Sequence, residues 1–347
     1  MSLIPMGCVT VPDSIAFSEP IEAASVQNVF VASSRLPAPV SVDASQDRET
    51  ELKYARYDVS IPPTHALGQI EWPDAEPDAN TDFVVVGEQD FASESELLAA
   101  IRKERDDEIL VFIHGYNNTS SEALYRFAQV GHDFQTPTPM LLFAWPSAGQ
   151  PQGYVYDLSS VSFSRDPLAD LLTEISRKTN KKIALIAHSM GSHLAMEVMR
   201  QLALTGRRDV LNDLDVVALL SPDIDPDVFR SQATVIGELP DPFVIMTSQN
   251  DRALSLSAFL NVGRQRVGNL TEAEDVEGFD ITIFDFSAVA DGSSGDHLVP
   301  FTSPAAIALM RNVVKTDERG EPDLSEFTIG ADGVVRANPP DTTAPTQ

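Results

Sequence analysis

The sequence predicts an α/β fold with a mainly parallel sheet and helices on both faces. Short runs of consecutive apolar, β-prone residues indicate strands that are buried on both sides. Between them, stretches of about a dozen residues keep apolar positions at helical spacing, which is typical of alternating strands and helices. The runs that predict strands are 109–113, 141–145, 183–186, 216–220, 243–246 and 281–284.

The segments outside this alternation predict the limits of a single domain. Residues 1–28 carry Pro, Ser and Glu without a period and predict an extended arm. The apolar runs 29–32 and 57–61 predict antiparallel edge strands, so the domain is expected to cover 29–314. Residues 315–347 are polar and rich in proline, which predicts a flexible tail.

Composition excludes several classes of partner. The 347 residues carry a formal net charge of −28, with 43% hydrophobic and 22% charged residues. Such an acidic chain is unsuited to nucleic acid or to an anionic membrane surface, and a solvated surface explains the charge. No run approaches the roughly 20 apolar residues of a transmembrane segment.

Cysteine usage and the first residues bear on the compartment. Cys8 is the single cysteine, so no intramolecular disulfide can form. Residues 1–8 are too short for the apolar region of a signal peptide, which favours a cytoplasmic protein. The alternative is a periplasmic or lipid-anchored protein, attached through Cys8 if an upstream leader is missing.

A nucleophile elbow is predicted at Ser189. The buried strand 183–186 is followed by Ala187-His188-Ser189-Met190-Gly191 and then by a helical pattern. A serine at a sharp strand-to-helix turn, with small residues around it, is typical of an exposed nucleophile above a helix N-terminus. Ala187 stands where this pattern usually has glycine, and alanine is nearly as small.

A nucleophilic serine needs a base and an acid that orients the base. In chain order the acid follows a strand beyond the elbow, and the histidine follows the last strand. Asp251 lies five residues after Met246, at the end of one predicted strand, and His297 lies in the loop after the strand near Phe286. They are the predicted acid and base of Ser189. Asp223 and Asp225, after the preceding strand, are alternative acids.

The other five histidines are predicted to be structural. His65 precedes the sheet pattern, and His132 and His193 lie on predicted helices. His188 adjoins the predicted nucleophile, and His114 opens a turn. His188 and His193 are five positions apart with no third ligand in evidence, so no metal site is predicted. No glycine-rich phosphate loop occurs either, and no cofactor is expected.

An oxyanion hole is predicted from two backbone N–H groups. One belongs to Met190, the residue after the nucleophile, and the other to Tyr116 in the loop after residue 113. His114-Gly115 opens this loop between an apolar strand and a capped helix, and His114 is expected to fix the loop by hydrogen bonds.

Several segments together resemble a bacterial α/β-hydrolase family of unknown function. They are VSIPPTH (59–65), FIHGYNN (112–118), WPSAG (145–149), AHSMG (187–191), SPDID (221–225) and DRAL (251–254). The likeness covers roughly residues 28–312. It implies an α/β-hydrolase fold with a serine triad, which maps onto Ser189, Asp251 and His297, and it implies no particular substrate.

The activity expected from these residues is hydrolysis of a small carboxylic ester or thioester. Transfer of the acyl group to another alcohol and a non-catalytic binding or scaffold role are the alternatives. Residues 147–165, a predicted loop that contains Tyr154 and Tyr156, and residues 225–239 are the predicted pocket walls. Because both segments are short, we expect an open site that prefers short acyl chains. The sequence leaves the oligomeric state open.

Overall fold

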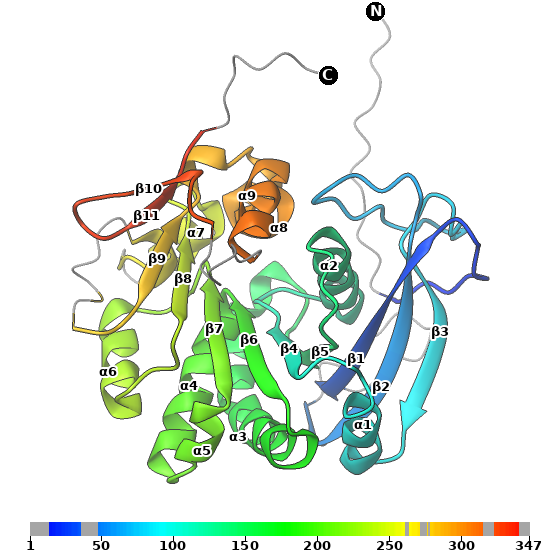
Figure 1. Cartoon of the computed structure of the whole chain (residues 1–347), viewed down its shortest axis with the longest axis horizontal. Helices are drawn as coiled ribbons and strands as arrows, with labels where there is room; N and C mark the ends of the chain where they lie inside the picture. Colours follow the sequence, from blue (N-terminus) through cyan, green and yellow to red (C-terminus); the bar gives the residue numbers. More distant parts are fainter. Residues whose placement is uncertain are drawn as a thin grey trace, which may run out of the picture.

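A computed structural model describes residues 14–35, 48–260, 264–270, 276, 278–314 and 323–339. Within these ranges the strands form one 11-stranded sheet (Figure 1). In spatial order it contains β10 (Phe327–Ile329), β11 (Val335–Ala337), β9 (Thr282–Asp285), β8 (Phe243–Thr247), β7 (Leu214–Leu220), β6 (Lys182–His188), β4 (Glu108–Ile113), β5 (Met140–Ala144), β1 (Ser25–Arg35), β2 (Arg48–Ile61) and β3 (Val84–Phe91).

The pairing agrees with the predicted sheet. Neighbouring strands from β11 through to β1 run parallel, while β1, β2 and β3 pair antiparallel at one edge and β10 pairs antiparallel with β11 at the other. Parallel neighbours point their carboxyl ends toward the same edge of the sheet. Loops that follow β4, β6, β7 and β8 are therefore brought together, as the expected site requires.

Helices cover both faces of the sheet, as predicted. They are α1 (Glu94–Ile101), α2 (Ser120–Asp133), α3 (Tyr154–Thr179), α4 (Met190–Leu204), α5 (Arg208–Asn212), α6 (Pro226–Ile236), α7 (Arg252–Leu260), α8 (Val299–Thr302) and α9 (Pro304–Val314). Within the described ranges, none of them is long and apolar enough to cross a membrane.

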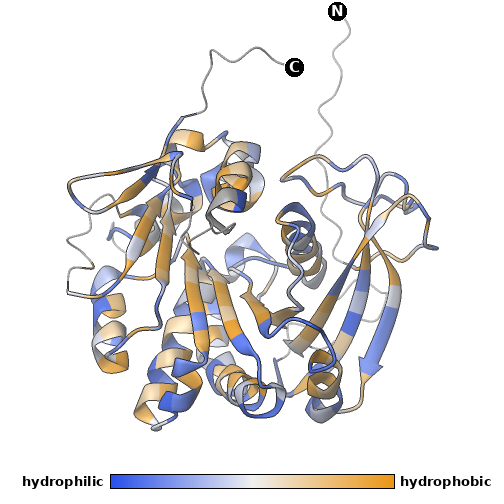
Figure 2. Cartoon of the chain, viewed as in Figure 1, coloured by the Kyte–Doolittle hydropathy of each residue, from blue (hydrophilic) through white to orange (hydrophobic). Residues whose placement is uncertain are grey.

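Two apolar cores lie on opposite faces of the sheet. In β4, Val111 joins the core beneath α1, α3, α4, α5 and α6, whereas its neighbour Phe112 joins the core beneath α2, α8 and α9. Successive strand residues point to opposite faces, and both faces of β4 are apolar because both are buried. The apolar strands between the two layers of helices are visible in Figure 2.

The segment 147–165 departs from its prediction as a loop. Helix α3 begins at Tyr154, and Pro167, expected in the first turn of a helix, lies inside it. A proline within a helix removes one backbone hydrogen bond. Here Val161 before the proline and Leu168 after it are both buried in the same core, so packing favours one continuous helix.

The sheet also extends beyond the predicted domain boundary at Val314. Strands β10 and β11 add an edge beyond β9, within the segment expected to be a flexible tail. Phe327 is 8% exposed, and its ring centroid lies 5.5 Å from that of Phe284 and 6.3 Å from that of Phe286. Three-residue strands are too short for a periodic pattern, which explains why the sequence did not reveal them.

Replacing Phe327 by alanine is expected to destabilise the protein by about 3 kcal/mol, because a large aromatic side chain leaves a cavity against β9. Ile329 in the same strand is 64% exposed, and Ile329→Ala should change stability by less than about 0.5 kcal/mol. Urea unfolding of the two variants measures both effects. Equal effects would show that β10 does not anchor the end of the chain to the sheet.

Candidate active site

Ser189 occupies a strained turn between β6 and α4. Its φ of 54° and ψ of −122° lie in a region that non-glycine residues rarely adopt, at a cost of about 1–3 kcal/mol. The turn is held by its backbone, because Ser189 N–H donates to Leu220 O at 2.9 Å and Ser189 O accepts from Asp223 N–H at 3.2 Å. Ala187, where glycine is usual, is fully buried at the end of β6.

Two glycines let the loop after β4 approach this turn. A Cβ on Gly191 would lie 2.3 Å from His114 O, which is closer than real Cβ atoms come. On the other side, a Cβ on Gly115 would lie 2.6 Å from His188 Nδ1 and 3.0 Å from Ser189 Cβ. The absence of side chains at these two positions therefore places the His-Gly loop directly against the serine.

Asp251 and His297 are in direct contact. Asp251 Oδ2 lies 2.6 Å from His297 Nδ1, and Asp251 is fully buried while the His297 side chain is 14% exposed. Asp251 Oδ1 also accepts from Leu254 N–H at 2.9 Å, so the same carboxylate caps α7. The His297 ring lies 4.6 Å from the ring of His188, the residue before Ser189. The fold thus brings the predicted base to the elbow.

The alternative acids have other partners. Asp223 Oδ1 lies 3.1 Å from Arg266 Nε and accepts from Ser257 Oγ at 2.6 Å, and Asp223 Oδ2 accepts from the Tyr154 hydroxyl at 3.0 Å. Asp225 caps α6 through its side chain. The contact with His297 therefore belongs to Asp251, in the loop after β8.

The two predicted oxyanion donors flank the serine. Met190 is the first residue of α4, where a backbone N–H has no partner within its own helix. Tyr116 follows Gly115 in the loop after β4. Among the described residues, neither N–H donates to a protein acceptor. The Tyr116 hydroxyl donates to Pro151 O, which anchors the side chain away from the backbone N–H.

His114 fixes the loop after β4 without carrying charge. Because this loop contains the predicted oxyanion donor Tyr116, we call it the oxyanion loop. Its ring stacks on Trp145 at 4.9 Å between centroids, with Nδ1 2.9 Å from Gly115 O and Nε2 3.1 Å from Trp145 O. Trp145 Nε1 donates in turn to His114 O at 2.7 Å. Complete burial lowers the pKa of His114 to about 3, so the ring is neutral near pH 7 and donates a hydrogen bond to only one of these two carbonyl oxygens.

Asp157 is a supporting residue that the sequence analysis missed. Its carboxylate is fully buried and accepts from Ser147 Oγ at 2.7 Å, Ala148 N–H at 2.6 Å and Asn117 N–H at 3.2 Å. It therefore ties the oxyanion loop to the loop after β5. Burial raises the pKa of Asp157 although these hydrogen bonds oppose the shift.

A signal for Asp157 exists in the sequence. Asp157, Val161, Ser164 and Leu168 follow one another at spacings of three and four, and all four side chains are buried. They form one face of α3. The helix start predicted at Asp166-Pro167 leaves out residues 154–165, which are roughly the first three turns of α3 and contain the buried carboxylate.

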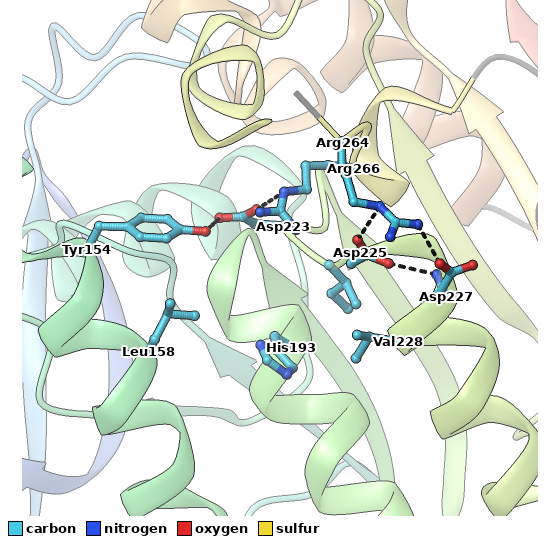
Figure 3. A pocket seen from close by; sticks show the side chains of 10 residues that line it. Tyr154, Leu158, His193, Asp223, Asp225, Asp227, Val228, Arg264 and Arg266 are labelled. Atoms are coloured by element: carbon cyan, nitrogen blue, oxygen red, sulfur yellow. Dashed lines mark hydrogen bonds and ion pairs between the residues drawn. The ribbon is translucent and has the colours of Figure 1, made fainter. Parts of the chain in front are cut away.

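A pocket of about 530 Å³, lined by both charged and apolar side chains, lies beside the elbow (Figure 3). Tyr154, Asp223, Arg266 and Arg264 form its upper edge, and Leu158 lies below them. The residues that complete the lining are His193, Ile224, Asp225, Asp227 and Val228. Segment 225–239, predicted to be a pocket wall, contributes through α6. The catalytic candidates themselves do not line this pocket.

The two predicted substrate-binding tyrosines point to different places. Tyr154 reaches the pocket edge, and its ring packs edge-on against Tyr116 at 5.4 Å between centroids. Tyr156 is turned toward β2, where the Arg48 guanidinium lies 4.3 Å from its ring centroid and Arg48 also donates to Tyr156 O at 3.1 Å. Tyr154 is therefore the better placed of the two to contact a substrate.

The parallel sheet, the strained serine after β6 and the Asp251–His297 pair define an α/β hydrolase. The family model described as an alpha/beta hydrolase of unknown function matches residues 89–315, which is well over half of the chain. The chain belongs to that family, and the resemblance found in the sequence is confirmed.

Further similarities are distant. The chain is 30% identical over 128 residues to the uncharacterized protein alr1448 of Nostoc sp., covering 29% of this chain and 33% of that protein. Among solved structures, Aspergillus fumigatus lipase B gives a TM-score of 0.43 at 14% identity, covering 72% of this chain and 63% of that one. A dienelactone hydrolase from Anabaena variabilis gives 0.37 at 12% identity, covering 82% and 95%. The chain thus spans about a third of the Nostoc protein.

Asp157→Asn is expected to loosen the oxyanion loop, because an amide cannot accept from all three donors that the carboxylate satisfies. The free energy of unfolding should fall by about 1–3 kcal/mol. Hydrogen exchange at the Asn117 and Ala148 amides should accelerate. Asp166→Asn is the control on the same helix, since its side chain is 62% exposed. Unchanged exchange in Asp157→Asn would refute the anchoring role.

Proposed function

We propose that this protein is a serine hydrolase that cleaves carboxylic esters or thioesters through an acyl-enzyme. The observation that carries the proposal is the contact of Asp251 with His297 at 2.6 Å, beside a serine held at a positive φ after β6. A buried carboxylate on one imidazole nitrogen orients the ring, and a sharp strand-to-helix turn lifts a serine hydroxyl above the sheet edge, where Ser189 is 3% exposed.

Acylation follows from the donor and acceptor roles of these groups. A carboxylate only accepts hydrogen bonds, so His297 Nδ1 carries a proton toward Asp251 and Nε2 is left with a free lone pair. Nε2 takes the proton of Ser189 Oγ as this oxygen attacks the acyl carbon. The N–H groups of Met190 and Tyr116 stabilise the resulting oxyanion, and each such donor contributes roughly 10²–10³ in rate.

The tetrahedral intermediate then collapses. The bond from the acyl carbon to the leaving oxygen or sulfur breaks, and the proton on His297 Nε2 passes to the departing alcohol or thiol. In the second half of the reaction His297 removes a proton from water, which attacks the acyl-enzyme. The carboxylic acid leaves as Ser189 regains its proton.

The surroundings of the site favour a small or polar substrate. Tyr154 connects the loop after β4 with the pocket, because its ring packs on Tyr116 while its hydroxyl donates to Asp223 at the pocket edge. Two arginines, Arg264 and Arg266, lie along the same pocket edge. A long apolar acyl chain would meet charged groups there instead of a continuous apolar channel.

A fluorophosphonate probe is expected to label Ser189, because an activated serine attacks the phosphorus centre. Ser189→Ala should lose labelling and lower ester hydrolysis by about six orders of magnitude. Ser192→Ala is the matched control. Ser192 lies three residues further on, and its Oγ donates to Ala187 O at 2.9 Å, so labelling should persist. A folded protein that resists the probe would exclude this activity and favour a binding role.

Hydrolysis of p-nitrophenyl esters is expected to be fastest with acetyl or butyryl groups. Each added methylene that meets charged groups gains none of the roughly 0.8 kcal/mol that burial would supply, and it costs free energy by displacing water from those groups. We therefore expect kcat/KM for the butyrate to exceed that for the decanoate by about tenfold or more. Ser189→Ala supplies the background rate. A clear preference for the decanoate would reject the short-chain specificity.

A further inference from the structure

A second cluster of chemically active side chains lies away from Ser189. Within the described ranges, His65, His132 and Asp133 each offer a ligand atom, and these atoms all lie within 4.8 Å of one another. His65 follows β2, whereas His132 and Asp133 end α2, so the cluster joins two segments that are distant in sequence. The side chains of His65 and Asp133 are only 6% and 1% exposed.

Both imidazole rings are oriented by a second hydrogen bond. Glu71 Oε2 lies 2.8 Å from His65 Nδ1, and Ser25 Oγ lies 3.0 Å from His132 Nδ1. Each contact occupies Nδ1 and leaves Nε2 of the same ring for another partner. A carboxylate or hydroxyl on the outer nitrogen is the usual support of metal-binding histidines, because it fixes the tautomer and the ring orientation.

The carboxylate of Asp133 is oriented in the same way. Its Oδ2 accepts from Gly68 N–H at 2.8 Å and from Gln129 Nε2, while its Oδ1 lies 2.9 Å from His65 Nε2. Thus one oxygen is held by the protein and the other faces the histidines. His65 and Asp133 thus face each other through one atom each and have the second atom anchored, while His132 has its Nδ1 anchored by Ser25.

We propose that His65 Nε2, His132 Nε2 and Asp133 Oδ1 form a binding site for a divalent transition metal ion, with Zn²⁺ as the best fit. Two imidazoles and one carboxylate are a common zinc donor set, with a water molecule in the fourth position. Metal–ligand distances of about 2.1 Å in a tetrahedron put ligand atoms about 3.4 Å apart. The observed separations, 2.9 Å for one pair and at most 4.8 Å for the others, need only small side-chain shifts.

A proton competes with the metal for His65 Nε2. The His65 ring lies between two carboxylates, with Nδ1 2.8 Å from Glu71 Oε2 and Nε2 2.9 Å from Asp133 Oδ1. A metal ion needs the lone pair of Nε2, so a proton held between Nε2 and Asp133 leaves to solvent when the ion binds.

A metal ion bound here would connect structural elements and would take no part in the chemistry at Ser189. Gln129 Nε2, which holds Asp133, also donates to Phe301 O at 3.1 Å. Phe301 belongs to α8, which begins at Val299, two residues after His297. The ion would therefore fix the segment after β2 and the end of α2 against the helix that follows the predicted base. The inference does not depend on the proposed hydrolase activity.

The test uses the full chain without a polyhistidine tag, freed of metal by a chelator and titrated with ZnCl₂ by calorimetry. We expect one tight site per chain and a higher Tm with Zn²⁺. His132→Gln should lose both effects, and Ser25→Ala should weaken binding by about 10–100-fold. His193→Gln is the control, since His193 lies in the pocket and outside the cluster, and it should bind as the wild type does.

Cobalt provides an independent readout that does not need activity. Wild type with Co²⁺ should develop the visible absorption of a four-coordinate ion, and His132→Gln, checked for folding by circular dichroism, should not. Two results would overturn the proposal. One is folded wild type without stoichiometric Zn²⁺ binding, which would leave a proton as the bridging cation. The other is binding by His132→Gln equal to that of wild type.

Discussion

The close approach of three backbone segments at Ser189 is the constraint on which the site depends. Gly191 allows α4 to start against His114 O, and Gly115 allows the loop after β4 to pass beside His188 and Ser189. A side chain at either glycine would push the loop after β4 away from Ser189, and with it the predicted oxyanion donor Tyr116. The strained serine persists because neighbouring strands and helices hold its backbone on both sides, and packing in both cores supports those elements.

The positions of Ser189, Asp251 and His297 could be predicted because their order follows from sheet topology. Each comes after a strand whose carboxyl end reaches the same edge, so residues far apart in sequence meet there. The helix cap formed by Asp251 follows from local sequence as well, since an Asp just before a helix commonly accepts from its first N–H groups. That these residues react with a substrate stays a prediction, because position alone does not establish chemistry.

Other features depend on tertiary context that local patterns do not contain. The pair Asp166-Pro167 resembles a helix start, yet buried residues on both sides carry α3 through it. Strands β10 and β11 have three residues each. They are strands because β11 pairs with the edge of β9 and β10 pairs with β11. The cluster of His65, His132 and Asp133 has no metal-binding spacing, because its members come from separate segments that α2 and the loop after β2 bring together.

The predicted base His297 is held from two sides by unlike means. On one side a direct contact reaches Asp251, which is itself fixed by capping α7. On the other side, α8 begins two residues after His297. Gln129 donates to Phe301 O in α8 and to Asp133 of the cluster of His65, His132 and Asp133, and so connects the two. The first attachment sets the orientation of the ring, and the second limits movement of the loop. Precise placement of the histidine therefore requires both the sheet edge at β8 and the opposite layer of helices.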